Sequence, residues 1–185
     1  GLDDLTWTMN FGTGAKIDDQ FSRLRELRPN SPLMCSEFWS GWFDKWGARH
    51  ETRPAKDMVA GIDEMLSKGI SFSLYMTHGG TSFGHWAGAN SPGFAPDVTS
   101  YDYDAPINEY GEPTEKFWLL RKTLEKYADK KLPAVPKKVA GIISIPKLKL
   151  QNMAPIYMGV DSTAESRDVQ TFEEMNMGYG SMIYN

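Results

Sequence analysis

Residues 32–47, PLMCSEFWSGWFDKWG, join the end of an apolar run to a group of aromatic side chains. The run from Leu33 to Phe38 has the length and composition of a buried β-strand, and Glu37 lies near its C-terminal end. Three tryptophans follow the glutamate within eight residues: Trp39, Trp42 and Trp46. The stretch therefore predicts a strand that ends in an acidic and aromatic segment.

The tryptophan spacing allows two interpretations. Positions i, i+3 and i+7 form one face of a helix, which would make the segment a buried aromatic stripe. Against a helix, Gly41 and Gly47 interrupt the segment, and a glycine costs about 1 kcal/mol in a helix interior. Tryptophan also offers an apolar body and a polar edge, which suits a sugar ring. The alternative is the wall of a binding site with Glu37 in its floor.

Strand and helix patterns alternate around this stretch. Strands are predicted at 6–11, 33–38 and 70–76, and helices at 18–29, 54–68 and 114–127. Asp18 or Asp19 is the expected N-cap of the first helix. The third helix is expected to bury one face, formed by Phe117, Leu120, Leu124 and Tyr127. The alternation predicts an α/β fold with a parallel sheet covered by helices.

The long loop from about 78 to 112 also points to function. Loops of that length are uncommon and usually functional, and a (β/α) barrel builds its active site from the loops after its strands. Glu37 and Tyr75 both lie at strand ends, and SYDYDAP (100–106) lies within the loop. Each also has an ordinary interpretation: a structural ion pair for Glu37, a core tyrosine for Tyr75 and a plain turn for 100–106.

The composition of the chain changes after residue 130. KKLPAVPKK (130–138) predicts a linker at 131–138, so that 1–130 form the α/β part and 139–185 begin a β-rich domain. Short strands are expected there at 139–145, 147–150 and 180–184.

The charge and hydropathy of the chain argue against two classes of partner. The net charge of −4, without a basic run, argues against binding to nucleic acid or to anionic membranes. No apolar run approaches the ~18 to 20 residues of a membrane span.

Metals, cofactors and disulfides are not expected. FGTGAK (11–16) lacks the third glycine of a dinucleotide loop and the Ser or Thr of a phosphate loop. The three histidines, His50, His78 and His85, lack the spacing of metal ligands. Cys35 is the single cysteine, so no internal disulfide can form.

Three long motifs in this order resemble the β-galactosidases of glycoside hydrolase family 35. They are SEFWSGWFDKWG (36–47), SLYMTHGGTSFGHWAGAN (73–90) and TSYDYDAPINEYGEPTEKFWLLR (99–121). The resemblance implies a (β/α)8 TIM barrel followed by β-sandwich domains. It also implies retaining hydrolysis of terminal β-D-galactose from oligosaccharides or glycoconjugates, without a cofactor and outside the cytoplasm, in the periplasm, the lysosome or the medium.

The resemblance also assigns roles to four residues. Glu37 corresponds to the nucleophile, Trp42 lines the galactose pocket, Tyr75 lies beside the nucleophile and Tyr103 contacts galactose. The other two tryptophans of the segment are expected to be packing residues. A retaining glycosidase needs its attacking carboxylate ionised, and the Tyr75 hydroxyl is the donor expected to hold it so.

The sequence departs from the family at the general acid/base. The I-E-N-E-Y-G motif that carries it is absent; NEYG occurs at 108–111, but in a loop, so the role is not transferred to Glu109. We therefore expect this chain to hold the last three βα units of the barrel, with the acid/base and the remaining units upstream. Two alternatives stay open: a non-catalytic galactose-binding module, and an exo-β-glucosaminidase of the same family.

Overall fold

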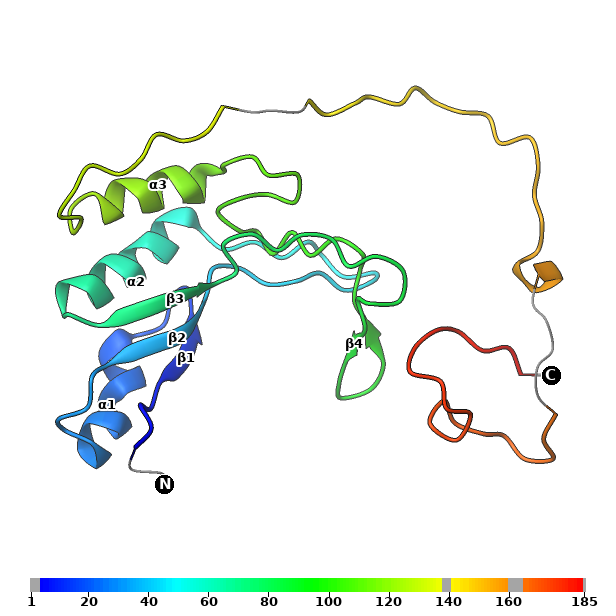
Figure 1. Ribbon diagram of the computed structural model, residues 1–185, viewed down its shortest axis with the longest axis horizontal. Coiled ribbons are helices and arrows are strands. Elements are labelled where there is room, and N and C mark those ends of the chain that lie inside the picture. The colour runs from blue at the N-terminus through cyan, green and yellow to red at the C-terminus, as the bar shows by residue number, and fades with distance from the viewer. Residues whose placement is uncertain (1–3, 138–140, 160–164, 185) are drawn as a thin grey trace. The chain divides into compact units, whose positions relative to one another are not determined.

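The computed structural model describes residues 4–137, 141–159 and 165–184. Up to Pro136 the chain forms one compact unit in which strands and helices alternate (Figure 1). Its elements are β1 (Met9–Gly12), α1 (Ile17–Leu27), β2 (Met34–Trp39), α2 (Ala55–Ser67), β3 (Ser71–Tyr75) and α3 (Glu115–Leu124). Two short strands, β4 (Ala89–Asn90) and β5 (Ala95–Pro96), pair within the loop between β3 and α3. The predicted alternation is confirmed.

The three longer strands form a parallel sheet in the order β1-β2-β3. Each crossover leads to the next strand in the same direction, and such connections are almost always right-handed, so successive helices lie on one face. The ring pairs agree, because Phe11 of β1 lies edge-on to both Phe21 of α1 and Phe38 of β2. Phe38 in turn lies against Gly61 of α2.

The core lies between the sheet and the first two helices. Each helix contributes three fully buried residues at the spacing of a single helical face: Ile17, Phe21 and Leu24 from α1, and Met58, Ile62 and Met65 from α2. They pack against the buried Phe11, Cys35 and Phe38 of the sheet. Burying a side chain of this size contributes about 1.5–3 kcal/mol, so this layer fixes the arrangement of the strands.

Two local predictions for the helices are wrong. Helix α1 begins at Ile17 after Lys16, not after Asp18 or Asp19. Both aspartates lie in its first turn, where negative charge suits the helix dipole. The Asp18 carboxylate accepts from Lys68 Nζ, at 2.6 Å, at the C-cap of α2.

Helix α3 buries a different face from the apolar face predicted. Its buried positions are Lys116 and Thr123, with Leu120 packed against the core between them. Leu120 belongs to the predicted face, whereas Lys116 and Thr123 each precede a predicted position by one residue; the amine of Lys116 is buried with three hydrogen-bond acceptors. Tyr127 lies beyond the end of the helix, where its hydroxyl bonds Asp63 of α2.

The second compact unit, Lys137–Asn185, is described by itself. It contains one short 3₁₀ helix, Ile156–Gly159. No strand is assigned to 141–150 or 180–184, where strands are predicted, and Val139 and Ala140 lie outside the described residues. A strand needs a hydrogen-bonded neighbour, and the described part of this unit supplies none. The β-rich domain therefore stays a prediction.

The face of the sheet opposite the helices carries polar side chains. Residues in register on parallel strands point to the same side. Phe11, Phe38 and Leu74 share the helix side, so the pairs Asn10↔Glu37 and Trp39↔Tyr75 point away from it. No helix in the described ranges is long and apolar enough to cross a membrane.

Candidate functional site

Glu37 reaches the open face of the sheet because β2 is irregular. Cys35 and Phe38 are both fully buried on the helix side, although strict alternation would put residues three apart on opposite faces. The pairing of β2 with β3 shifts between these two residues, which resolves the conflict. Glu37 is half-buried and lies near the C-terminal end of the strand.

The indole of Trp39 holds the Glu37 carboxylate. Trp39 Nε1 donates to Glu37 Oε2 at 2.7 Å, and the two side chains share a face because they lie two apart on one strand. Sequence reasoning missed this role by assigning Trp39 to packing, although the i, i+2 spacing was the available signal. The donor expected was Tyr75, but its hydroxyl is hydrogen-bonded to that of Tyr101, at 3.2 Å.

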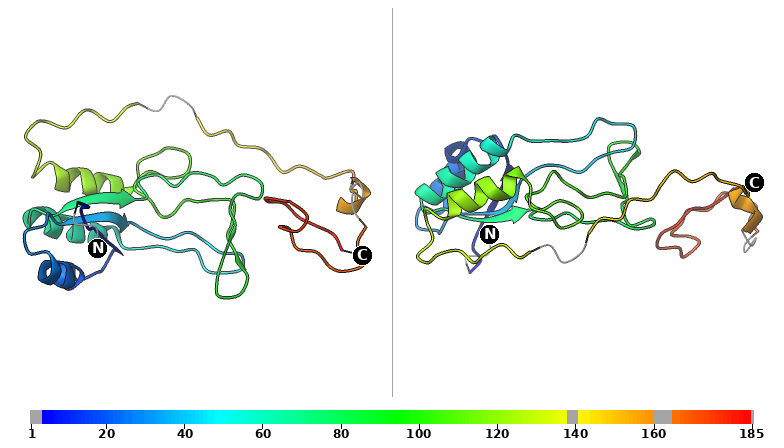
Figure 2. Two further views of the ribbon diagram at one scale, coloured as in Figure 1. Left: turned by 60° about the horizontal axis from the view of Figure 1, so that its bottom comes forward. Right: turned by 90° about the horizontal axis from the view of Figure 1, so that it is seen from above.

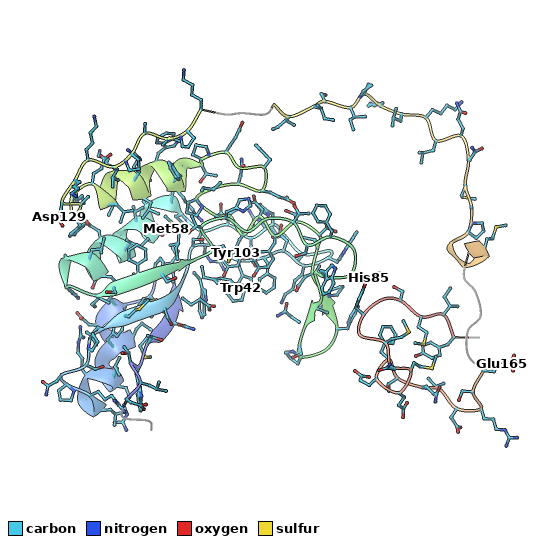
Figure 3. The ribbon with its side chains drawn as sticks, in the orientation of Figure 1. Trp42, Met58, His85, Tyr103, Asp129 and Glu165 are labelled. Atoms are coloured by element: carbon cyan, nitrogen blue, oxygen red, sulfur yellow. The ribbon has the colours of Figure 1, made fainter. Side chains whose placement is uncertain are left out.

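Three of the four predicted site residues form one aromatic cluster. Ring centroids lie 6.2 Å apart for Trp42 and Tyr103, and 5.5 Å apart for Tyr75 and Tyr103. Tyr101 joins the cluster by stacking on Tyr103 at 5.4 Å. Figure 3 shows Trp42 and Tyr103 close together in the loops beyond the strand ends.

The helical interpretation of the tryptophan segment is wrong. Trp39 is the last residue of β2, and Trp42 lies in the loop that follows. The two rings meet edge-on at 5.6 Å. Trp46, predicted to pack, is 73% exposed. The segment leaves the sheet as a loop, which places Trp42 over the strand ends.

Burial raises the pKa of two phenols of the cluster, Tyr101 and Tyr103. Tyr103 is 2% exposed, and burial raises its pKa, with the neighbouring Tyr75 and the Glu37 carboxylate adding to the shift. Burial also raises the pKa of Tyr101, and its hydrogen bond with Tyr75 adds to this. Neutral hydroxyls at this position can both donate and accept hydrogen bonds.

Two glycines bring the loops into backbone contact. A Cβ on Gly41 would lie 1.8 Å from the Tyr103 carbonyl oxygen, and one on Gly79 would lie 1.6 Å from that of Tyr101. Only glycine fits such an approach, so these positions fix the 101–103 segment over the strand ends. Figure 2 shows the loops after β2 and β3 extending from the same end of the sheet.

Glu109, the glutamate of NEYG, is used inside the second loop. Its carboxylate accepts from the hydroxyls of Thr81 and Ser100, the latter at 2.5 Å. Its backbone N–H donates to Asp102 at 3.3 Å. These bonds assign Glu109 to holding the loop together.

An open hollow of about 560 Å³ adjoins the cluster. The rings of Trp39 and Trp42 line it. Thr13, after β1, and the Glu51–Arg53 ion pair complete its walls. Aromatic faces beside charged and hydroxyl groups suit a polar ring compound. Within the residues described, no group of three or more His, Cys, Asp or Glu side chains is arranged to hold a metal ion.

A family model and several known proteins match this chain. A family model described as glycosyl hydrolases family 35 matches residues 1–127. The chain is 38% identical to the beta-galactosidase of Homo sapiens, over 99% of this chain and 28% of the human protein. It is 37% identical to a beta-galactosidase-1-like protein of Mus musculus, over 99% of this chain and 29% of the mouse protein. It is 35% identical to the beta-galactosidase of Xanthomonas manihotis, over 99% of this chain and 31% of that protein. The chain thus spans less than a third of the length of each of these relatives.

Proposed function

The chain belongs to the glycosyl hydrolases of family 35, and from this premise we propose that it carries the nucleophile of a retaining β-galactosidase. Its substrates are terminal β-D-galactosides of oligosaccharides or glycoconjugates, hydrolysed outside the cytoplasm. The observation that supports this most directly is the position of Glu37. Its carboxylate lies near a strand end and is held by the indole N–H of Trp39, whose ring lies edge-on to Trp42 of the aromatic cluster.

In this proposal the three βα units are the last three of a (β/α)8 barrel. The order of β1, β2 and β3, with consecutive crossovers, is the arrangement that a barrel repeats. The strand C-terminal ends, where Glu37 and Tyr75 lie, are the end at which barrel enzymes act. The other five units and the general acid/base come from upstream sequence.

The reaction proceeds in two displacements at the anomeric carbon. Glu37 attacks C1 of galactose and forms a glycosyl ester, while the acid/base donates its proton to the departing glycosidic oxygen. Water, deprotonated by the same group, then attacks C1 and releases galactose and the Glu37 carboxylate. Since Trp39 bonds Oε2, we assign the attack to Oε1.

The aromatic cluster supplies the contacts to the sugar. The Trp42 ring provides an apolar face for the galactose C–H groups, and the Tyr103 phenol provides a neutral hydrogen-bonding partner for its hydroxyls. Tyr75 lies edge-on to Tyr103 and so borders the same position. The cluster therefore contacts one face of the sugar from loops that the strand ends hold in place.

Covalent trapping tests the proposal. A 2-fluoro-galactoside with a good leaving group is incubated with the full-length protein, which is then digested and analysed by mass spectrometry. We expect the label on Glu37, because fluorine slows hydrolysis of the glycosyl ester. A label on another side chain would contradict the assignment. A parallel panel of β-galactoside and β-glucosaminide substrates distinguishes the galactosidase from the glucosaminidase alternative.

Replacing Trp39 by Phe should lower kcat/KM about 10- to 100-fold. The change keeps an aromatic ring but removes the N–H donor to the Glu37 carboxylate, and a hydrogen bond to a charged group contributes about 1.5–3 kcal/mol. Trp46→Phe is the matched control, because that side chain is 73% exposed. Equal kcat/KM in both variants would show that the indole N–H has no part in the reaction.

A further inference from the structure

Lys116 is a buried cation beside the candidate site. It is the second residue of α3 and is 3% exposed. Its ammonium donates three hydrogen bonds: to the Ser40 carbonyl at 2.7 Å, to the Asp104 carbonyl at 2.7 Å and to Asp104 Oδ2 at 2.6 Å. All three protons of the ammonium are thus directed at two short segments.

These two segments carry the candidate site. Ser40 follows β2, and it ties that strand to the end of β3: its N–H donates to the Tyr75 carbonyl at 3.2 Å and its hydroxyl to the Met76 carbonyl at 2.8 Å. Asp104 follows Tyr103, and both have a left-handed backbone, with φ of 49° and 62°. Lys116 therefore links the strand that carries Glu37 to the turn that carries Tyr103.

The ion pair with Asp104 does not by itself account for a lysine at this position. A buried ion pair gains little over an apolar pair of similar volume, because both charges lose their hydration. The first turn of a helix is also unfavourable for a cation, since the dipole is positive there. Burial lowers the pKa of Lys116 despite the opposing effect of Asp104, so the site disfavours the charged form relative to water. What the ammonium adds to the ion pair is its bonds to two carbonyl oxygens, which hold two segments of the chain at one point.

We propose that Lys116 is a positioning residue. It holds the end of β2 and the Tyr103–Asp104 turn at a fixed distance from each other, so that Glu37 and Tyr103 contact the same sugar. This inference rests on the proposed function. Lys116 acts only through the segments it links. Its removal should therefore change how well the nucleophile is aligned, apart from any change in folding.

The test separates alignment from folding with a paired substitution. Lys116→Met alone leaves the Asp104 carboxylate without its cation and lowers the melting temperature. Adding Asp104→Asn removes that charge as well; asparagine tolerates a left-handed φ, and its amide oxygen can still accept from the Arg53 N–H. The double variant of the full-length protein should regain part of the melting temperature lost by Lys116→Met, although the Ser40 and Asp104 carbonyls still lack their donor. Its rate constant for covalent labelling of Glu37 by a saturating 2-fluoro-galactoside should nevertheless fall about 10- to 100-fold.

Lys122 provides the control on the same helix, because its side chain is exposed. Lys122→Met should label at the unchanged rate. The inference is overturned if the folded double variant labels Glu37 as fast as the unchanged protein. It is also overturned if the loss of rate only matches the unfolded fraction measured by circular dichroism. An unchanged protein labelled elsewhere than Glu37 would refute the proposed function, and this inference with it.

Discussion

Glu37→Gln in the full-length protein is expected to lower kcat for a β-galactoside by roughly 10⁴- to 10⁶-fold, the range seen when one member of a catalytic group of residues is removed. The amide has the size of the carboxylate, and its oxygen can still accept from Trp39 Nε1. It carries no charge, however, and cannot form the glycosyl ester. The measurement is steady-state turnover of a chromogenic galactoside, with the melting temperature recorded alongside.

Binding and a matched control complete this experiment. Because the aromatic cluster is untouched, Glu37→Gln should still bind galactosides, with a change in tryptophan fluorescence. Glu26→Gln, on the exposed face of α1, should keep full turnover. Turnover by Glu37→Gln at the rate of the unchanged protein would remove the nucleophile assignment. A protein that bound galactose but never turned over any galactoside would support a binding module instead.

The parts of the fold that could be predicted are those with a local period. The predicted strand 33–38 and helix 54–68 differ by one residue at each end from β2 and α2. The strand is a short continuous apolar run, and the apolar positions of the helix repeat at the period of one buried face. The same pattern placed Glu37 near a strand end, and the parallel alternation placed Tyr75 near the end of the next strand. The site's location thus follows from short-range signals.

The contacts that complete the site are long-range and carry no local signal. Lys116 lies 76 residues from Ser40 in the chain, and a lysine in an amphipathic helix is normally expected to face solvent. The left-handed backbone of Tyr103 is equally hidden, because that conformation is usually marked by glycine. Trp39 is different: the predicted strand ended at Phe38, one residue before it, and Trp39 was expected to pack, whereas β2 includes it and so places it on the same face as Glu37. Side-chain partners depend on the whole fold, whereas strand ends do not.

Gly41→Ala should strongly destabilise the protein. The added Cβ would lie 1.8 Å from the carbonyl oxygen of Tyr103 and 2.9 Å from its carbonyl carbon. These are backbone atoms of a turn already held by Lys116, so no side-chain rotation relieves the clash. We expect the free energy of unfolding to fall by about 3 kcal/mol, the upper end for overpacking, and turnover to fall about 100-fold as Tyr103 moves. Denaturant unfolding and steady-state kinetics measure the two effects.

Gly79→Ala tests the same turn from its other side, because its Cβ would lie 1.6 Å from the Tyr101 carbonyl oxygen. Gly141→Ala is the control: that Cβ meets no atom within 4 Å, and stability and turnover should not change. Substitutions that share a partner are not additive. Once one alanine has displaced the 101–103 segment, the second clash is partly relieved, so the double variant should lose less stability than the sum of the two single losses. Strict additivity would show that the two glycines support separate structures and that the tyrosines do not move as one unit.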